Sequence, residues 1–91
     1  MFRMWGKIMK SNRLVRDTVI EIPYNPDLSR TAKVYRSLEE ICYEFDLEKP
    51  MWLDSTKKEF LYHSKCRFYA DNFIEDIDFD YLEMQVLEEE Y

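Results

Sequence analysis

Carboxylates at alternating positions are the residues in this sequence whose types and spacing point most directly to chemistry. Asp76, Asp78 and Asp80 are separated by single apolar residues, and Asp71 lies five positions upstream of the first of them. Carboxylate oxygens are the ligands that hard divalent cations prefer in proteins. One hypothesis for the protein is therefore a small metal-dependent hydrolase that uses these four carboxylates.

A calcium-binding loop of the EF-hand type does not fit this stretch. Counted from Asp76, such a loop needs glycine at its sixth position and glutamate at its twelfth, whereas the sequence has Tyr81 and Leu87 there. If the stretch is extended instead, its carboxylates lie about 7 Å apart along one edge, which forms no compact site. We favour an acidic surface that faces solvent or a partner, and we keep Asp76, Asp78 and Asp80 only as secondary candidates for metal ligands.

The single histidine and the two cysteines do not form a recognisable site. His63 precedes Cys66 by three positions, but zinc requires three or four protein ligands, and Cys42 falls on an apolar helical stripe. A cysteine nucleophile would need a base and an activating group beside it, and no motif provides them. One glycine is too few for a phosphate-binding glycine loop. We therefore predict no catalytic residue and no cofactor.

Aromatic side chains make up 16% of the chain, and tryptophan and tyrosine are enriched at the energetic centres of protein interfaces. In so small a domain, most aromatic residues supply the hydrophobic core. Trp5 and Trp52 are the two that we expect to anchor a partner at the surface. Together with Asp76, Asp78 and Asp80, they form the predicted partner-binding set.

Length and composition limit the classes of protein that are possible. A chain of 91 residues with 46% apolar residues predicts one folded domain spanning residues 1–91. A net charge of −6 disfavours general binding to nucleic acids or anionic membranes. No signal peptide and no apolar run of roughly 18 residues is present. Two cysteines are too few for a secreted disulfide framework, so we expect a cytoplasmic protein with reduced thiols that binds neither nucleic acid nor membrane.

Alternating apolar and polar residues predict strands near both ends of the chain. Residues 2–10 form the first, with Gly6 as a bulge or a point of close approach, and residues 14–22 form the second after a short polar connection. Residues 81–88 have the cleanest alternation. Residues 67–73 are a plausible third strand.

A helical period replaces this alternation in the middle of the chain. Residues 29–46 carry one apolar stripe, formed by Val34, Leu38, Ile41, Cys42 and Phe45. A capping-box pattern at Ser37 leaves open a later helix start, with residues 31–35 extended before it. Residues 55–64 predict a shorter second helix whose Phe60 faces the core.

The order β-β-α-α-β-β predicts an α+β fold, in which an antiparallel sheet of about four strands has helices packed on one face. Residues 1–16 contain five basic residues and no acid, whereas residues 71–90 contain nine acids and no base. Opposite charges stabilise neighbouring strands and like charges oppose their pairing. The first and last strands are therefore predicted to be neighbours in the sheet.

Several segments resemble a family of small, acidic, single-domain bacterial proteins found as uncharacterised open reading frames of anaerobes. The segments are RDTVIE (16–21), LEEICYEFDL (38–47), KPMWLDS (49–55) and RF-x-x-DNFIEDIDFDYLE-x-QV (67–86). The resemblance covers nearly the whole chain and implies a bacterial, cytoplasmic origin. It implies no activity, cofactor or functional residue.

The sequence favours a non-enzymatic module that binds a protein partner, or a second copy of itself, through an acidic C-terminal strand and an aromatic surface. The metal-dependent hydrolase built on Asp71, Asp76, Asp78 and Asp80 remains an alternative. Another is an acidic decoy, whose carboxylates imitate phosphates and occupy a nucleic-acid-binding protein.

Overall fold

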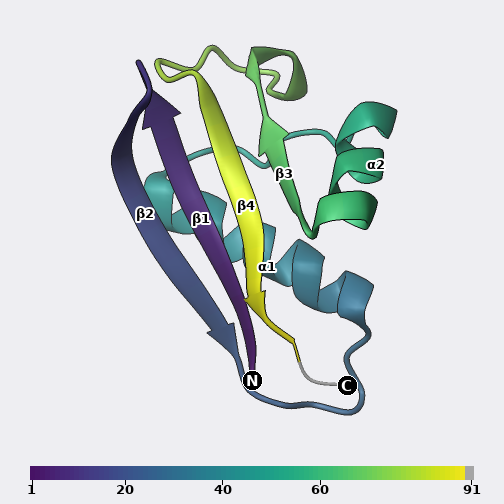
Figure 1. Cartoon of the computed structure of the whole chain (residues 1–91). Coiled ribbons are helices and arrows are strands. Elements are labelled where there is room, and N and C mark those ends of the chain that lie inside the picture. The colour runs from purple at the N-terminus through teal and green to yellow at the C-terminus, as the bar shows by residue number, and fades with distance from the viewer. Residues whose placement is uncertain (90–91) are drawn as a thin grey trace.

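The first and the last strand of the chain lie side by side in the centre of a four-stranded antiparallel sheet (Figure 1). The computed structural model describes residues 1–89. Its elements are β1 (Phe2–Lys10), β2 (Arg13–Ile22), α1 (Arg30–Phe45), α2 (Asp54–His63), β3 (Lys65–Phe68), the 3-10 helix η1 (Ala70–Asn72) and β4 (Tyr81–Glu88). The strand order is β2-β1-β4-β3. The predicted α+β fold and the predicted order of elements are confirmed.

The first and last strands are neighbours, as the charge pattern predicts. β1 and β4 pair antiparallel, with Lys7 opposite Glu83 and Arg3 opposite Glu88. The basic end of the chain is thus laid against its acidic end, where cross-strand ion pairs can form.

A two-residue turn joins β1 to β2. Ser11 and Asn12 have φ angles of 53° and 62°, the left-handed conformation that a tight turn of type I′ requires at both positions. A register shift follows, because Ile8 pairs with Arg16 while Met9 pairs with Leu14. Val15 is therefore an extra residue in β2, and a bulge of this kind bends the strand and redirects its side chains.

Helix α1 begins where the longer of the two predicted helices begins. The Ser29 side chain accepts a hydrogen bond from the backbone N–H of Ala32 at 3.1 Å and caps the first turn. The alternative start at Ser37 is wrong, because the residues before it are already helical. All five residues of the predicted apolar stripe are buried. The helix ends at Asp46, which adopts the left-handed conformation with a φ of 56°.

Close contact between β1 and α1 explains the only glycine. A Cβ atom on Gly6 would lie 2.8 Å from Cγ2 of Ile41, closer than side-chain carbons approach one another. The strand register is regular at this position, so Gly6 marks close approach and not a bulge. The absent side chain lets the helix settle onto the sheet.

Helix α2 covers the β3 edge of the sheet (Figure 1). Its Phe60 is buried, as predicted. The Glu59 carboxylate accepts a hydrogen bond at 2.7 Å from the backbone N–H of Arg67 in β3. The predicted third strand at 67–73 is wrong in its bounds, since β3 spans Lys65–Phe68 and the chain then turns into η1.

The segment 73–80 is a loop, so the extended alternative for the alternating aspartates is wrong. Buried Asn72 anchors the start of this loop. Its side-chain amide donates to the carbonyl of Met51 at 2.9 Å and to the hydroxyl of Thr56 at 3.0 Å, and its oxygen accepts from the backbone N–H of Tyr69. One side chain therefore ties three segments together.

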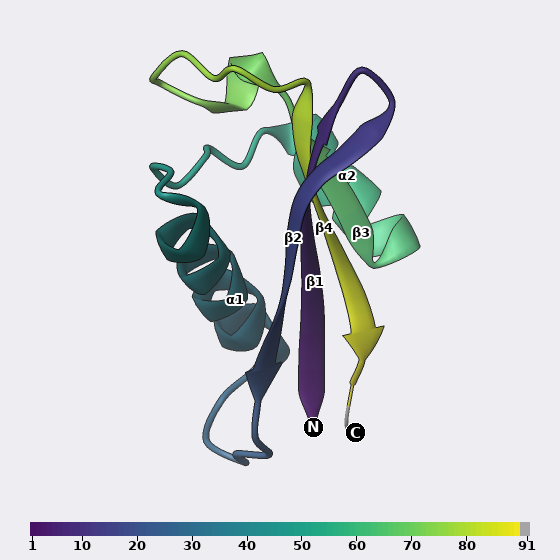
Figure 2. The same ribbon diagram turned by 90° about the vertical axis from the view of Figure 1, so that its left-hand side faces the viewer.

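The two faces of the sheet differ. Figure 2 shows α1 against one face, whereas in the described part of the chain, residues 1–89, no helix crosses the opposite face of β1, β2 and β4. We call this second surface the open face. Within residues 1–89, no helix combines the length and the apolar character that a membrane crossing requires.

Candidate functional site

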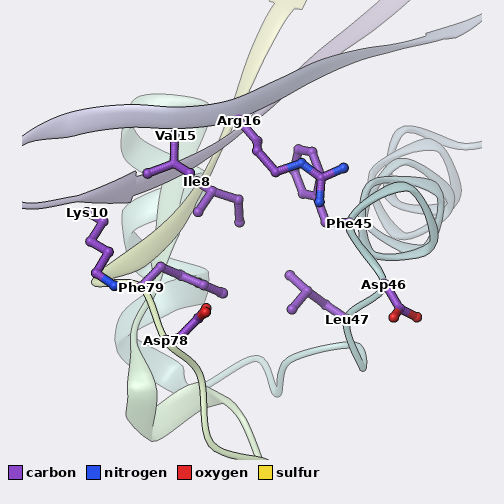
Figure 3. Close-up of a pocket in the computed structure, with 9 residues that line it drawn as sticks. All are labelled: Ile8, Lys10, Val15, Arg16, Phe45, Asp46, Leu47, Asp78 and Phe79. Atoms are coloured by element: carbon purple, nitrogen blue, oxygen red, sulfur yellow. The ribbon is translucent and has the colours of Figure 1, made fainter.

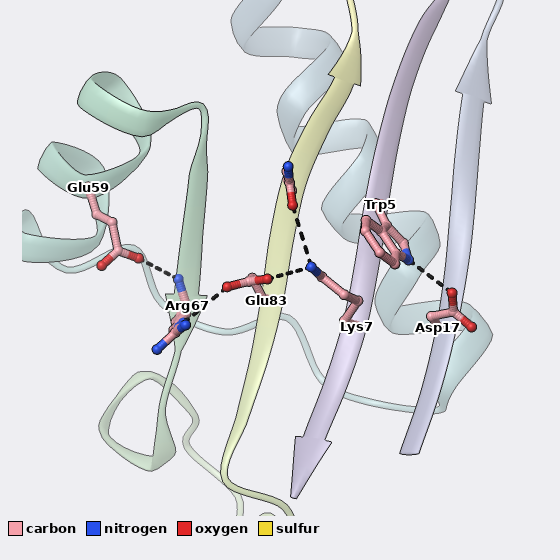
Figure 4. A network of polar contacts seen from close by, with 7 residues as sticks. Trp5, Lys7, Asp17, Glu59, Arg67 and Glu83 are labelled. Carbon is pink, nitrogen blue, oxygen red and sulfur yellow. Dashed lines mark hydrogen bonds and ion pairs between the residues drawn. The ribbon is translucent and has the colours of Figure 1, made fainter. Parts of the chain in front are cut away.

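A polar network occupies the middle of the open face (Figure 4). The Glu83 carboxylate lies between two cations, with Oε2 at 2.6 Å from Nζ of Lys7 and Oε1 at 3.0 Å from Nε of Arg67. Glu83 is only 7% exposed. Burial alone would raise the pKa of Glu83, but the hydrogen bonds and positive charges of Lys7 and Arg67 outweigh it and hold this pKa below its usual value.

Trp5 stands beside this network at the centre of the sheet. Its indole Nε1 donates a hydrogen bond of 2.9 Å to the Asp17 carboxylate on β2, and Nζ of Lys7 lies 3.9 Å from its ring centroid. The cation and the hydrogen bond fix the orientation of the ring. Val19 lies opposite Trp5 on β2 and is 44% exposed. Trp5 and Val19 together give the open face an apolar centre.

Both acidic residues of β4 form ion pairs with other side chains of the protein. Glu88 lies 3.2 Å from Arg3, which also contacts Glu21 at 3.4 Å. Glu83 is held between Lys7 and Arg67 as described. The acidic strand is thus neutralised mainly by its neighbours.

The two edges of the sheet are covered unequally. The β3 edge lies beneath α2, and Glu59 satisfies a backbone N–H there. Within residues 1–89 there is no strand on the outer side of β2, and apart from the ladder with β1 no backbone hydrogen bond from another element reaches this strand. Leu14, Val15 and Val19 of β2 are about half exposed. β2 is therefore a free edge of ten residues.

A cavity of about 500 Å³ opens at the end of the sheet near the β1–β2 turn (Figure 3). Its walls come from the strands, the end of α1 and the loop before β4. The apolar lining residues are Ile8, Val15, Phe45, Leu47 and Phe79. A volume of this size, with apolar walls and a few polar groups, is typical of small-molecule sites.

Four charged side chains also line this cavity: Lys10, Arg16, Asp46 and Asp78. Figure 3 shows the Asp78 carboxylate between Phe79 and Leu47, whereas the Asp46 carboxylate points away from the other lining residues. The Arg16 guanidinium lies 4.9 Å from the ring centroid of Phe45. Two cations and one carboxylate therefore face the same apolar space.

The structure separates the aspartates that the sequence groups together. Asp76 is exposed in the loop, Asp78 lines the cavity, and Asp80 accepts a hydrogen bond of 2.8 Å from the backbone N–H of Ser11. Asp71 lies in η1, on the surface. In the part of the chain that the structure describes, no three histidine, cysteine, aspartate or glutamate side chains are grouped closely enough to hold a metal ion.

Trp52, the second predicted anchor, lies half-buried against the core. Its ring makes edge-to-face contacts with Tyr35, Phe60 and Phe68, at centroid distances of 5.9, 5.9 and 5.0 Å. It thus closes the core between α1, α2 and β3. Of the two tryptophans, Trp5 is the one that lies on the open face.

The two thiols lie inside the protein. Burial raises the pKa of Cys42 to about 11, and it raises the pKa of Cys66 as well. His63 is exposed while Cys66 is completely buried, so these two side chains do not form a pair. Thiols held in the protonated form are poor nucleophiles and poor metal ligands.

Sequence reasoning missed the carboxylate bridge and the cavity. The signal for the bridge was present, since the paired charges of the first and last strands predict ion pairs. Nothing in the sequence indicated which carboxylate would be buried. The cavity depends on a bulge at Val15 and on the path of a loop, and neither leaves a pattern in the sequence.

Comparison with known protein families, with curated proteins and with solved structures gives no significant match to this chain. The resemblance to small acidic bacterial proteins stays a prediction.

Proposed function

We propose that the protein is a non-enzymatic interaction module, which binds an extended segment of a partner protein along the free edge of β2. The observation that carries the proposal is the contrast between the two edges of the sheet. Glu59 and α2 cover β3, whereas within residues 1–89 no strand pairs with the outer side of the ten-residue β2. An uncovered edge presents unpaired N–H and C=O groups, and an incoming strand can pair with them.

Side chains beside this edge would give the interaction its affinity. A partner strand next to β2 would place alternate side chains over Val19 and toward Trp5, which lies one strand further in. Tryptophan is among the residues that contribute most to binding when a partner excludes water from them. Because hydrogen bonding to Asp17 already fixes the Trp5 ring, little side-chain entropy is lost on binding.

Charges along β2 would give the interaction its specificity. The first half of the strand carries the basic Arg13 and Arg16, and the acidic Asp17 and Glu21 follow them. Charged edge residues discourage unselective pairing with other sheets. A partner segment with complementary charges would overcome this barrier. We place the interaction in the cytoplasm, because both thiols are free and buried, as is usual in a reducing compartment.

A display library of random ten-residue peptides tests this proposal. Selected peptides should protect the amides of residues 13–22 from hydrogen exchange. Val19→Asp and Trp5→Ala should each weaken binding by about tenfold or more. Tyr62→Ala is the matched control, because Tyr62 is 83% exposed on α2, which packs on β3 at the opposite edge of the sheet from β2. This variant should bind as the wild type does.

Binding that survives Val19→Asp, or protection confined to another element, would overturn the proposal. A triple lysine substitution at Asp76, Asp78 and Asp80 separates the alternative in which the acidic loop holds the partner. Light scattering on the wild type and on Val19→Asp shows whether the bound segment is β2 of a second copy, since only that dimer would dissociate in the variant.

A further inference from the structure

We propose that the cavity between the β1–β2 hairpin and the loop before β4 binds a small zwitterion with an apolar body, of the class of aromatic or branched α-amino acids. The cavity shares Val15 and Arg16 with β2 but lies at the end of the sheet near the β1–β2 turn, and the inference goes beyond the interaction module. It stands on the size of the cavity, its lining and the signs of the charges within it.

The walls would hold an apolar side chain. Ile8 and Val15 come from the strands, Phe45 and Leu47 from the end of α1, and Phe79 from the loop. The bulge in β2 brings Val15 and Arg16 to this end of the sheet, and bulges frequently lie beside binding sites because they redirect side chains. The cavity, at about 500 Å³, falls within the range of small-molecule pockets, roughly 300–1,000 Å³.

Charged groups of both signs face this space without being neutralised by the protein. Within residues 1–89, the ion pairs of the protein involve none of Lys10, Arg16 and Asp78. Arg16 lies against the Phe45 ring, and one of its nitrogens reaches the carbonyl of Glu44 at 3.5 Å. These contacts orient the guanidinium and leave donors available for a carboxylate.

The combination of signs selects the class of ligand. A purely anionic ligand would pair with Lys10 and Arg16 but would bury the Asp78 carboxylate beside its own negative charge. A purely cationic ligand would leave both cations unpaired in a less polar space. Lys10, Arg16 and Asp78 are exposed to solvent, and a ligand that covered them without matching their charges would leave a charge unpaired, which is unfavourable. A ligand with one carboxylate and one ammonium group therefore matches the site best.

Calorimetry and thermal unfolding with L-phenylalanine as the probe test this inference. The melting temperature should rise saturably with its concentration, because the ligand binds only the native state. 3-Phenylpropionate lacks the ammonium group and phenethylamine lacks the carboxylate. Each should therefore bind at least about tenfold more weakly than L-phenylalanine. Glycine has both charges but no apolar body, and it should give no shift in the same concentration range.

Two variants assign the charges. Asp78→Asn should abolish the preference for phenylalanine over 3-phenylpropionate, and Arg16→Gln should abolish the preference for phenylalanine over phenethylamine. Each preference is a ratio measured within one variant, so a change in the stability of the fold does not affect it. Asp76→Asn and Arg13→Gln are the matched controls, from the same loop and the same strand but outside the cavity lining, and both should keep the wild-type preferences.

The inference would be overturned if L-phenylalanine gave no saturable shift. Equal binding of phenylalanine and 3-phenylpropionate to the wild type would overturn it in favour of a simple anion site. Preferences that survived in both Asp78→Asn and Arg16→Gln would place the binding elsewhere on the protein.

Discussion

Different interactions stabilise the two faces of the sheet: apolar packing on the face toward α1 and polar contacts on the open face. Toward α1, Met4 and Ile8 of β1 are at most 5% exposed, and Gly6 between them lets the helix approach. Toward the open face, Trp5 and Lys7 of the same strand form a hydrogen bond, an ion pair and a cation–π contact. Close packing removes apolar surface from water, whereas polar contacts at the surface contribute little net stability. The difference indicates that packing on the α1 side contributes most of the stability of the sheet.

Adjacent residues on the two faces provide the sharpest test. Met4 is completely buried and Trp5 is half-buried. Met4→Ala should lower the free energy of unfolding by about 2–5 kcal/mol through lost burial and a cavity. Trp5→Ala removes the larger side chain but should cost about 1 kcal/mol, close to a typical substitution. Urea denaturation followed by circular dichroism measures both. Equal losses would contradict the division between the faces.

Gly6 tests how tightly the covered face is packed. Gly6→Ala adds a Cβ atom that would lie 2.8 Å from the Ile41 side chain, and overpacking of this kind costs about 1–3 kcal/mol. Ile41→Ala removes all three side-chain carbons that this Cβ would meet and costs about 2–5 kcal/mol alone. The double variant should be more stable than the sum of the two losses indicates, because the contact is shared. Strict additivity in chemical denaturation would show that α1 moves away instead.

Most of the fold was predictable because local patterns and pairing charges agree with it. The alternation in residues 2–10 and 81–88 gives β1 and β4 with the observed bounds, and the helical stripe gives α1 to within one residue at each end. The basic and acidic ends of the chain correctly predict that β1 and β4 are neighbours. Local hydrophobic period and cross-strand charge are short-range properties, so the sequence carries them directly.

The candidate site was less predictable because it depends on tertiary structure. The alternating aspartates have the period of a strand, but the three hydrogen bonds of Asn72 hold the preceding segment in a turn, and a loop follows. Trp52 was expected at the surface, yet it packs against Phe68 at the edge of the core. Asp78 faces a cavity only because the loop returns over the end of α1. Such long-range placements override local pattern.

Glu83 is the side chain on the open face that is buried as a core residue is, at 7% exposure. Glu83→Gln keeps the shape of the side chain and removes its charge, so Lys7, whose side chain is 14% exposed, loses its counter-charge. We expect a loss of about 1–3 kcal/mol, the range for hydrogen bonds to charged groups. Denaturant unfolding near neutral pH measures it. No change would show that water replaces the carboxylate at no cost.

Acid titration separates the charge of Glu83 from its shape. The pKa of Glu83 is lowered in the folded protein, while in the unfolded chain a glutamate titrates near its ordinary pKa of about 4.3. Between these two pKa values the unfolded state binds more protons, so stability from Glu83 is present above about pH 4.3 and is lost as the pH falls through the folded pKa. Stability of Glu83→Gln should vary less with pH in this interval, whereas Glu88→Gln, at a more exposed ion pair, should follow the wild type.

The ion pairs of Arg3 are expected to contribute least to stability among the contacts of the open face that we test. Arg3 contacts Glu21 at 3.4 Å and Glu88 at 3.2 Å, but all three side chains are about half exposed. Water and salt screen such pairs, so Arg3→Ala should change stability by about 0–1 kcal/mol, and the change should shrink further as salt is added. Unfolding at low and high ionic strength measures it. A large effect that resists salt would mean that the pairs of Arg3 with Glu21 and Glu88 are protected from solvent. Ion pairs would then stabilise the open face as strongly as packing stabilises the face that α1 covers. A small, salt-sensitive effect would show that the Arg3 pairs contribute little, in contrast to the buried bridge of Glu83.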